Sequence, residues 1–361
     1  MPLDLDQDAA ALTAQLVDVY SESGHEGALA DDVAAVLGAV AHLEVLRDGD
    51  AVVARTRRGA AERVVVAGHL DTVPPADNLP SRLVGDLLYG LGSADMKAGL
   101  AVMLRLARHV ADPVRDVTYV FYDGEEVEAH RNGLLRVSAT HPEWLAGDLA
   151  VLMEPTGSVV EGGCQGTLRV EVAVTGTRAH SARSWLGDNA IHGAAQVLDI
   201  LRAYEPRRPV VDGLEFREGL NAVRIAGGVA GNVVPDRCVV TVNYRFAPDR
   251  SVAEAEEHVR SLFADLEVTV TDAAGGARPG LTAPPAADFV SAVGGTPRAK
   301  LGWTDVARFA ALGVPAVNFG PGDPAQAHTR GEHVSVDAVL AAEVRMRRWL
   351  DPRAGRQVSP A

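Results

Sequence analysis

The amino-acid sequence predicts an α/β fold with a mixed, largely parallel sheet, into which a smaller domain is inserted. The first observation is a pair of short, unbroken apolar runs at residues 117–122 and 149–153, which are typical of strands covered by helices on both faces. The second is the helical spacing of the apolar residues between 93 and 110. The third is a change in the order of elements between residues 167 and 280. A layered α/β domain built from both ends of the chain accounts for all three.

The first and last parts of the chain contain the elements expected of this layered domain. Apolar residues at helical spacing predict the helices, and short apolar runs predict the strands. The first part is predicted to contain helices at residues 8–20, 26–38 and 93–110 and strands at residues 43–47, 51–56, 63–68, 117–122 and 149–153. Helix and strand patterns resume at residues 288–293, 306–312, 316–319 and 336–350.

The middle of the chain has a different order of elements, which predicts a separate domain. A strand at residues 167–175 alternates apolar and polar residues, and a helix, two strands, a second helix and a last strand follow it. This β-α-β-β-α-β order is the split-βαβ, or ferredoxin-like, arrangement. A glycine-rich segment at residues 273–280 ends it and predicts a hinge. We therefore expect a discontinuous domain of residues 1–166 and 281–361 and an inserted domain of residues 167–280.

Composition and charge exclude several classes of function. Hydrophobic residues make up 47% of the 361 residues, enough for a sizeable core, and the formal net charge is -14. A net acidic protein gains nothing from nucleic acid or from an anionic membrane, so neither is an expected partner. The N-terminus lacks the pattern of a signal peptide, and no apolar stretch is long enough to span a bilayer. With Cys164 and Cys238 expected as free thiols, we predict a cytoplasmic protein.

His69 and Asp71 follow the strand predicted at residues 63–68, in the run GHLDTVP. A histidine binds a metal ion well when a carboxylate holds its other ring nitrogen, because this fixes the tautomer and raises the basicity of the ligand. A histidine beside an aspartate at a strand end is, by itself, more often a simple hydrogen-bonded pair. The pair gains its meaning from further acidic residues and a late histidine in similar settings.

Three more apolar strands lead into acidic residues or a histidine. The strand predicted at residues 117–122 leads to the run DGEE, the next strand leads to Glu154, and a strand near the C-terminus precedes a loop with His328. Ligands of open parallel sheets bind outside the carboxyl ends of the strands, so these side chains are expected around one crevice. Asp95 adds a fifth position at the start of the helix predicted at residues 93–110, where capping of that helix is the alternative interpretation.

This set of two histidines and three carboxylates suits zinc or a similar first-row divalent ion. Five protein ligands are too many for one catalytic zinc ion with an open position, but they fit two metal ions that share one carboxylate. Glu125 is then left to act as the general base toward a water molecule. The five predicted ligands are His69, Asp95, Glu126, Glu154 and His328.

As a set, these segments resemble the five metal-site motifs of the M20 family of dinuclear zinc metallopeptidases and deacylases. They occur in the same order and on the same elements, and the resemblance spans nearly the whole chain. It implies a catalytic domain of the zinc-exopeptidase type and an inserted domain that serves as a lid and dimerisation domain. The motifs are GHLDTVP (68–74), GLGSADMKAG (90–99), DGEE (123–126), MEPT (153–156) and AHTRGEHVS (327–335).

The resemblance implies how the metal ligands are shared. His69 and Glu154 would hold one of two divalent metal ions, and Glu126 and His328 would hold the other. Asp95 would bridge the two ions. Zinc is the implied metal, and cobalt could take its place.

Three further residues complete the catalytic machinery that the resemblance implies. Asp71 would orient His69, and Glu125 would move a proton from the attacking water to the leaving amine. His180, in the inserted domain, resembles the family histidine that reaches the active site of the partner subunit and helps to hold the oxyanion. A homodimer formed through the inserted domain, with closure of the lid, is thus expected.

Within this family, several stretches resemble the actinobacterial desuccinylases, including GNVVPD (231–236), NYRFAP (243–248) and GGTPRAKLGWTDVARF (294–309). The implied reaction is hydrolysis of N-succinyl-LL-2,6-diaminopimelate, a small acylated amino acid, in lysine and cell-wall precursor synthesis. Its three carboxylates require cationic and hydrogen-bonding groups, for which an arginine fork is well suited. The residues implied to bind this substrate are Arg245, Asn232, Gly295, Thr296 and Arg183.

One departure from the pattern concerns the run GGCQG at residues 162–166. Many desuccinylases of other bacteria carry basic residues there, so the resemblance implies that Cys164 or Gln165 replaces a charged contact. The departure weakens the expected substrate more than the expected metal site.

Other functions stay open at this point. The first alternative is another deacylase or dipeptidase of the family, such as an acetylornithine deacetylase-like enzyme, an aminoacylase or a carboxypeptidase, in which only the pocket differs. The second is a non-catalytic relative that binds acyl amino acids, which should have lost Glu125 or a ligand, whereas all of these are present. A dinucleotide-binding loop at residues 90–92 is disfavoured, because Asp95 takes the place of the third glycine and repels pyrophosphate.

Overall fold

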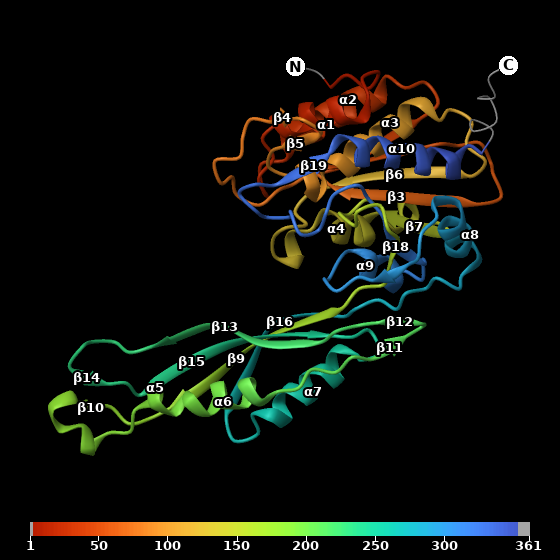
Figure 1. Cartoon of the computed structure of the whole chain (residues 1–361). Helices are drawn as coiled ribbons and strands as arrows, with labels where there is room; N and C mark the ends of the chain where they lie inside the picture. Colours follow the sequence, from red (N-terminus) through yellow and green to blue (C-terminus); the bar gives the residue numbers. More distant parts are fainter. Residues whose placement is uncertain (1–2, 353–361) are drawn as a thin grey trace. The chain divides into compact units, whose positions relative to one another are not determined.

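The computed structural model describes residues 3–352, which form two compact units (Figure 1). Within these residues, the second unit comprises Gly163–Pro279 and Ala299–Ala307, and the rest of the described chain forms the first unit. The predicted boundaries differ from these units chiefly at residues 299–307, which were assigned to the discontinuous domain. In the structure this segment belongs to the second unit, where Trp303 Nε1 donates a hydrogen bond of 3.1 Å to the carbonyl oxygen of Gly275.

The first unit is built on an eight-stranded mixed sheet, which confirms the predicted fold class. Strand β3 (Arg63–His69) lies inside it, parallel to β6 (Asp116–Tyr122) on one side and to β7 (Leu149–Leu152) on the other, and β18 (Ala316–Asn318) is parallel to β7. The full order is β1-β2-β6-β3-β7-β18-β8-β17, with β1 at Glu44–Asp48, β2 at Ala51–Arg55, β8 at Glu161–Gly162 and β17 at Arg298–Ala299. The parallel strands therefore end at the same edge of the sheet.

Helices bury both faces of the central strands, so most residues of these strands are apolar. All seven residues of β6 are buried. Val64 and Val66 of β3 join Tyr119 of β6 in one core with residues of α1, α2, α3 and α10 (Figure 1). The helices are α1 (Ala9–Asp18), α2 (Gly27–Gly38), α3 (Ala98–His109), α4 (Gly133–Thr140), α8 (Pro284–Val293), α9 (Val306–Ala311) and α10 (Val336–Leu350).

The helix predicted at residues 93–110 is wrong at its start. Residues Ser93–Lys97 form an irregular π-type turn, η1, and α3 begins only at Ala98. Within the turn, Asp95 (φ -124°, ψ 94°) and Met96 (φ -133°, ψ 36°) are not helical, and the peptide bond between them is cis. Asp95 is therefore not the cap of the helix, contrary to the alternative interpretation of this residue.

A small three-stranded sheet, which the sequence analysis does not predict, joins the two ends of the first unit. It consists of β4 (Arg82–Val84), β5 (Leu87–Tyr89) and β19 (His333–Ser335), in the order β19-β5-β4. Strand β5 leads directly into the turn η1, and β19 directly follows the loop with His328. Backbone pairing of β5 with β19 therefore holds the turn η1 close to the loop that contains His328.

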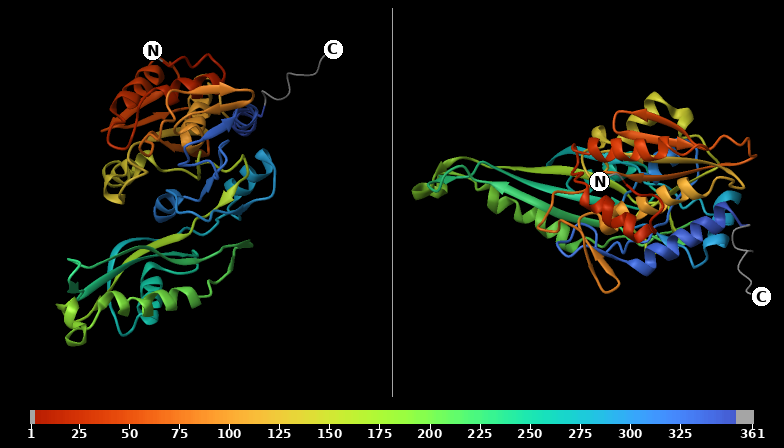
Figure 2. Two further views of the ribbon diagram at one scale, coloured as in Figure 1. Left: turned by 60° about the vertical axis from the view of Figure 1, so that its left-hand side comes forward. Right: turned by 90° about the horizontal axis from the view of Figure 1, so that it is seen from above.

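The second unit contains a four-stranded antiparallel sheet with helices on one face (Figure 1, Figure 2). The sheet order is β13-β15-β9-β16, and alternate residues of its two central strands pack with the helices in one core. The elements follow the chain as β9 (Gly166–Thr175), α5 (Ala190–Gly193), α6 (Ala195–Ala203), β13 (Gly219–Gly227), β15 (Arg237–Phe246), α7 (Val252–Leu262) and β16 (Glu267–Ala274). Two short ribbons extend it, β10 (Ala179–His180) with β14 (Val233–Val234) and β11 (Val210–Val211) with β12 (Leu214–Glu215).

None of the helices between residues 3 and 352 is long and apolar enough to cross a membrane.

Candidate metal centre

The carboxyl ends of β3, β6 and β7 bring three of the predicted site segments together. His69 is the last residue of β3 and pairs in register with Tyr122, the last residue of β6. The turn with Glu125 and Glu126 therefore starts beside His69, and Glu154 follows β7 on the other side of β3. The expectation that these strands deliver their polar residues to one edge of the sheet agrees with the structure.

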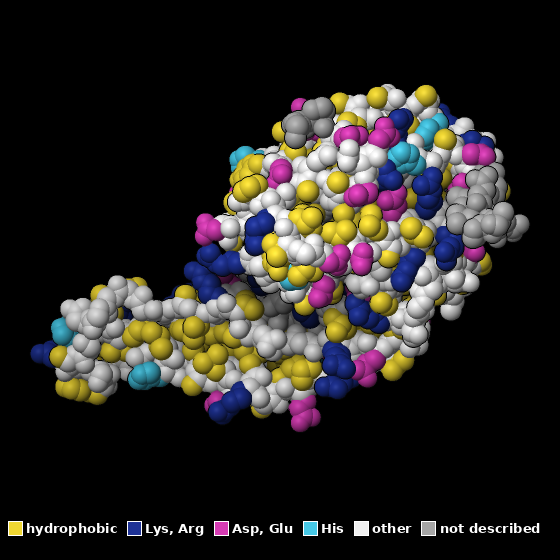
Figure 3. Space-filling view, turned by 45° about the horizontal axis from the view of Figure 1, so that its top comes forward, with side chains coloured by type: hydrophobic (Ala, Val, Ile, Leu, Met, Phe, Trp, Pro, Cys, Tyr) yellow, Lys and Arg dark blue, Asp and Glu magenta, His cyan; other side chains and the backbone are white. Residues whose placement is uncertain are grey.

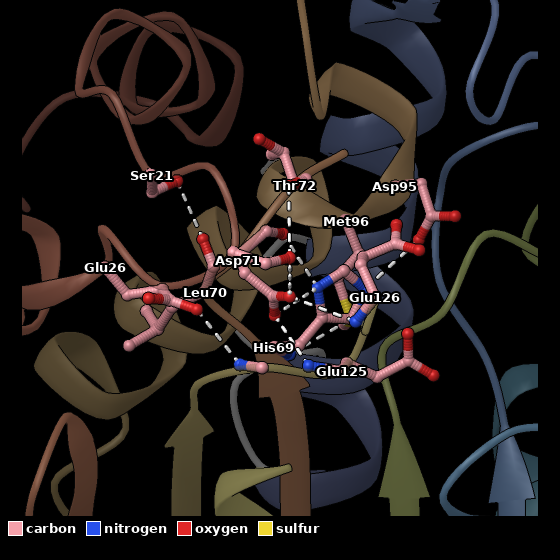
Figure 4. Close-up of polar contacts among 12 residues, drawn as sticks. Ser21, Glu26, His69, Leu70, Asp71, Thr72, Asp95, Met96, Glu125 and Glu126 are labelled. Carbon is pink, nitrogen blue, oxygen red and sulfur yellow. Dashed lines mark hydrogen bonds and ion pairs between the residues drawn. The ribbon is translucent and has the colours of Figure 1, made fainter. Parts of the chain in front are cut away.

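Asp95 lies between two histidines that come from opposite ends of the chain. Its Oδ1 atom is 3.3 Å from His69 Nε2, and its Oδ2 atom is 3.6 Å from His328 Nε2. Glu126 completes the arrangement, because its Oε1 atom is 2.8 Å from the same His328 nitrogen. Potential ligand atoms of His69, Asp95 and Glu126 all lie within 4.8 Å of one another, and Figure 4 shows these three side chains converging.

The electrostatic setting of both histidines favours a cation. Burial opposes protonation of His69, but hydrogen bonds with Asp71 and Asp95 outweigh it and raise the pKa of the imidazole well above its ordinary value. The hydrogen bond with Glu126 raises the pKa of His328 to about 9. Carboxylates thus surround both rings, which is the environment that a divalent cation would neutralise.

His328 adopts a backbone conformation that is unusual for a residue with a side chain. Its φ angle is 60°, in the left-handed region. Such a conformation costs on the order of 1–3 kcal/mol and persists only where the surroundings enforce it. At His328 this conformation accompanies the contact of Nε2 with Glu126 and Asp95, in agreement with a ligand role.

The Asp71 carboxylate holds the turn after β6 and also faces the His69 ring. Its Oδ1 atom accepts a hydrogen bond of 2.9 Å from the backbone N–H of Glu125, and its Oδ2 atom accepts one of 3.0 Å from the N–H of Glu126. The Ser23 hydroxyl donates to Oδ2 over 2.7 Å. His69 Nδ1 is 2.9 Å from the backbone carbonyl oxygen of Asp71 but 3.5 Å from its carboxylate. The backbone carbonyl and the carboxylate of residue 71 therefore both face the Nδ1 side of the ring, and the role of Asp71 in orienting His69 stays a prediction.

The N-terminal loop at residues 21–26 supports the site, a role that the sequence did not predict. Ser21 Oγ donates to the carbonyl oxygen of Leu70 over 2.8 Å, and Glu26 Oε1 accepts from the N–H of Gly124 over 3.1 Å (Figure 4). Both segments that carry site residues after β3 and β6 are therefore tied to one loop. The run SESGHE gives no signal of this role, because its residues act through backbone groups far away in the sequence.

Glu332 is a second missed residue, although it lies inside the motif that contains His328. Its buried carboxylate accepts hydrogen bonds from the N–H groups of Gly92, Ala94 and Asp95. Burial raises its pKa to about 7 in spite of these hydrogen bonds. The sequence gives no signal of this role, because the partners of Glu332 are backbone N–H groups far away in the sequence.

Glu154 and the loop with Gly295 and Thr296 come from neighbouring parts of the first unit. Glu154 is buried at the end of β7, outside the group formed by His69, Asp95 and Glu126. Arg298 Nη2 donates to the carbonyl oxygen of Thr156 over 3.0 Å. The loop before Arg298, in which Gly295 has a φ of 90°, is thereby held near the segment that carries Glu154.

Three predicted residues of the second unit lie together around the β10–β14 ribbon. His180 pairs with Val233, directly after Asn232, and the carbonyl oxygen of Asn232 accepts from the N–H of Ser181 over 2.9 Å. Arg183 follows in an exposed turn. His180 is exposed, and its Nδ1 atom accepts a hydrogen bond of 3.0 Å from the N–H of Ala182. The neutral ring consequently carries its proton on Nε2, where it can be donated outward.

Arg245 and the GGCQG run have different surroundings in the second unit. Arg245 lies half-buried on β15, where burial lowers its pKa and its Nε atom donates to Asn243 Oδ1 over 3.2 Å. Cys164 and Gln165 are buried: Cys164 Sγ donates to the Thr304 carbonyl oxygen over 3.6 Å, and Gln165 Nε2 donates to that of Arg217 over 2.6 Å. Both side chains thus bind the unit's own backbone, and the suggestion that one of them replaces a charged substrate contact stays a prediction.

Comparison with known proteins identifies the family of this chain. Residues 65–350 match Peptidase family M20/M25/M40, and the chain belongs to this family. It is accordingly a hydrolase that acts on amide bonds, and divalent metal ions are characteristic of the family.

Two relatives match over nearly their whole length. The chain is 58% identical over 351 residues to a protein of Mycobacterium tuberculosis that is provisionally named succinyl-diaminopimelate desuccinylase DapE, covering 96% of this chain and 99% of the relative. It is 48% identical over 359 residues to the succinyl-diaminopimelate desuccinylase of Corynebacterium glutamicum, covering 96% and 97%.

Solved structures with low sequence identity share the fold. Aminopeptidase PepT of Bacillus cereus has a TM-score of 0.76 at 19% identity, covering 97% of this chain and 99% of that one. The YXEP protein of Bacillus subtilis, described as a dinuclear metal-binding peptidase of the M20 family, has a TM-score of 0.69 at 16% identity, covering 94% and 96%.

Proposed function

We propose that this chain is a succinyl-diaminopimelate desuccinylase, which hydrolyses N-succinyl-LL-2,6-diaminopimelate to succinate and LL-2,6-diaminopimelate. The observation that carries the proposal is the Asp95 carboxylate, which directs one oxygen toward His69 and the other toward His328. A shared carboxylate of this kind is what a two-metal amide hydrolase needs. The substrate follows from the names of the two relatives that match along the whole chain. Such a biosynthetic enzyme would work in the cytoplasm.

The donor set suits two divalent ions, and zinc is the metal we propose. Imidazole nitrogens combined with carboxylate oxygens are typical zinc ligands, and the spacing of the donor atoms around Asp95 is short enough for shared coordination. One ion would be held by His69, Asp95 and Glu154, and the other by Asp95, Glu126 and His328. Bound there, the ions would lower the pKa of a water molecule and polarise the carbonyl of the scissile amide.

Glu125 is the proposed general base. Its backbone N–H is held by Asp71, so its side chain projects from a fixed turn beside the ligand Glu126. In the proposed reaction Glu125 takes a proton from the attacking water as the new C–O bond forms. It then gives that proton to the amine nitrogen as the C–N bond breaks, so that one carboxylate serves both steps.

His180 is the proposed donor to the oxyanion of the tetrahedral intermediate. The N–H of Ala182 occupies Nδ1, so the neutral ring has its proton on the exposed Nε2 atom. A donor of this kind stabilises the negative charge that develops on the carbonyl oxygen. Arg245 and Arg183, with Asn232 and the loop of Gly295 and Thr296, are the proposed partners of the substrate's carboxylates.

The substrate proposal is tested by comparing two acylated amino acids with the purified, zinc-loaded protein. We expect kcat/KM for N-succinyl-LL-2,6-diaminopimelate to exceed that for N-acetylornithine by about 100-fold or more, because a site built for charged groups rejects a substrate that leaves them unpaired. Release of succinate and of acetate would be followed under identical conditions. A preference for acetylornithine would support the alternative deacylase instead, with the same metal chemistry.

A homodimer formed through the second unit is the proposed assembly. Strand β13 is the edge of its sheet, and Val223 and Ile225 on it are 59% and 51% exposed. Ile191 and Leu198 expose further apolar surface on the neighbouring helices. Figure 3 shows hydrophobic side chains gathered along this unit. An exposed apolar edge strand is a template for pairing with another chain, which a second copy would satisfy.

We expect the double variant Val223→Glu/Ile225→Glu to be monomeric, because two buried carboxylates would oppose the pairing of β13. If His180 serves the partner's site, kcat should also fall by about 10²–10³-fold, the usual cost of one oxyanion donor. Light scattering after size-exclusion chromatography measures the mass. Val210→Glu, at an exposed site on β11, is the control that should stay dimeric. A wild-type protein that is monomeric in solution would contradict this assembly.

A further inference from the structure

Glu332 is a buried carboxylate whose hydrogen bonds all go to the turn that carries Asp95. The residue is 2% exposed and lies four positions after His328. Its Oε1 atom accepts from the N–H of Ala94 over 2.9 Å and from that of Asp95 over 3.0 Å, and its Oε2 atom accepts from Gly92 N over 2.8 Å. Its own carbonyl oxygen accepts from the N–H of Gly90 over 3.1 Å.

The turn η1 needs such a partner because it departs from helical geometry. Asp95 and Met96 have non-helical backbone angles, so the regular ladder of helical hydrogen bonds is interrupted at the residue that carries the shared carboxylate. Buried N–H groups that lack a helical partner must find another acceptor. Three of these N–H groups donate to the two oxygen atoms of the Glu332 carboxylate.

Close packing restricts the conformation of the backbone that precedes Asp95. Gly92 has a φ of 75°, and a Cβ atom at this residue would lie 2.7 Å from Thr72 Cγ2. Gly322 packs against the other side of the turn, where a Cβ atom would lie 2.3 Å from the carbonyl oxygen of Ala94. Glu332 therefore fixes a tightly enclosed segment, and its own loop is the one that presents His328.

From these contacts we propose that Glu332 is a positioning residue that sets the Asp95 carboxylate between His69 and His328 and so governs the binding of both metal ions. The inference rests on the proposed two-metal centre. All three hydrogen bonds of the Glu332 carboxylate come from the backbone of residues 92–95, and none comes from the side chain of another proposed ligand. A residue that acts through the shared ligand should affect both ions together, whereas loss of Glu154 should affect one.

The test uses Glu332→Gln in the full-length protein. The amide keeps one acceptor oxygen but places an NH₂ group against an N–H donor of the turn, because both carboxylate oxygens are used. We expect zinc to bind about 10- to 100-fold more weakly at both positions, the usual cost of a lost outer partner of a ligand. Competition titration with a chromophoric chelator gives the affinities, and the visible spectrum of the cobalt-loaded protein reports the ligand geometry.

Three further variants make the outcome decisive. Glu332→Asp keeps the charge and should recover part of the affinity, and it carries the same measurement if Glu332→Gln does not fold. Glu343→Gln is the matched control, because Glu343 is a buried glutamate of α10 that pairs with Arg105 over 3.2 Å, away from the turn. It should bind two zinc ions with wild-type affinity. Glu154→Gln should lose one ion.

Wild-type affinities and an unchanged cobalt spectrum in Glu332→Gln would overturn the positioning role. An equal loss of affinity in Glu343→Gln would also overturn it, because a general loss of stability would then explain the effect. A wild-type protein that binds fewer than two zinc ions would overturn the metal centre itself, which separates failure of the proposed function from failure of this inference.

Discussion

Replacement of Glu125 by alanine is expected to lower kcat by about 10³- to 10⁴-fold while both metal ions stay bound. In the proposed reaction this carboxylate both accepts and returns the transferred proton, and a positioned general acid–base group contributes up to about 10⁴-fold. None of the predicted metal ligands is removed, and the backbone N–H of residue 125 that binds Asp71 is kept. Steady-state release of succinate, with zinc content measured on the same samples, tests both halves of the prediction.

Glu128→Ala is the matched control for this experiment. Glu128 is an exposed carboxylate three residues farther along the same loop, where it faces Arg131 at 4.0 Å. Its removal should leave kcat within about twofold, because surface ion pairs of this kind contribute little. Near-normal activity in Glu125→Ala would contradict the proposed mechanism. Loss of zinc in that variant would instead indicate that Glu125 is a metal ligand.

The strands that deliver the site residues could be predicted because their pattern is set by burial alone. Strand β6 is buried at every position and β3 at all but its first, and the sequence accordingly has apolar runs at residues 64–67 and 119–122. A polar residue directly after such a run stands out against it. This contrast predicted His69 and Glu154, and the parallel pairing that brings them to one edge follows from the fold class.

The turn that carries Asp95 could not be predicted in the same way. The apolar residues after Asp95 repeat at helical spacing, and α3 does begin at Ala98, but nothing in this spacing reports the irregular backbone of η1. The turn is contacted by distant parts of the chain, among them the carboxylate of Glu332. Local periodicity contains no information on such contacts.

The supporting carboxylates were missed for the same physical reason. Glu26 and Glu332 accept hydrogen bonds from backbone N–H groups, and any residue type except proline provides such a donor. No side-chain pattern in the sequence therefore marks their partners. Asp71 was identified through its spacing from His69, but its hydrogen bonds with the backbone of a turn more than fifty residues away were not predicted.

The contacts of Asp71 lead to the second prediction with a large expected effect. Asp71→Asn should lower kcat by about 10²-fold or more with little change in KM. Burial raises the pKa of Asp71, but hydrogen bonds with His69 and with the N–H of Glu126 outweigh it and lower that pKa to about 2, so the group is ionised at neutral pH. An asparagine offers one acceptor oxygen where the carboxylate uses two, and its NH₂ group must face an N–H donor of the turn.

The predicted loss arises because the turn carries both the proposed base and a proposed ligand, and small displacements of a catalytic group are costly. Zinc affinity on the His69 side should change less than kcat, since the backbone carbonyl of residue 71 that holds the ring remains in the variant. Ser23→Ala, which removes only the hydroxyl donor to Asp71, should be milder. If Asp71 acted chiefly on the imidazole, Asp71→Asn would weaken zinc binding at His69 first and spare kcat in the zinc-saturated enzyme. Kinetics at saturating zinc, combined with zinc titration of the same variant, distinguish the two roles.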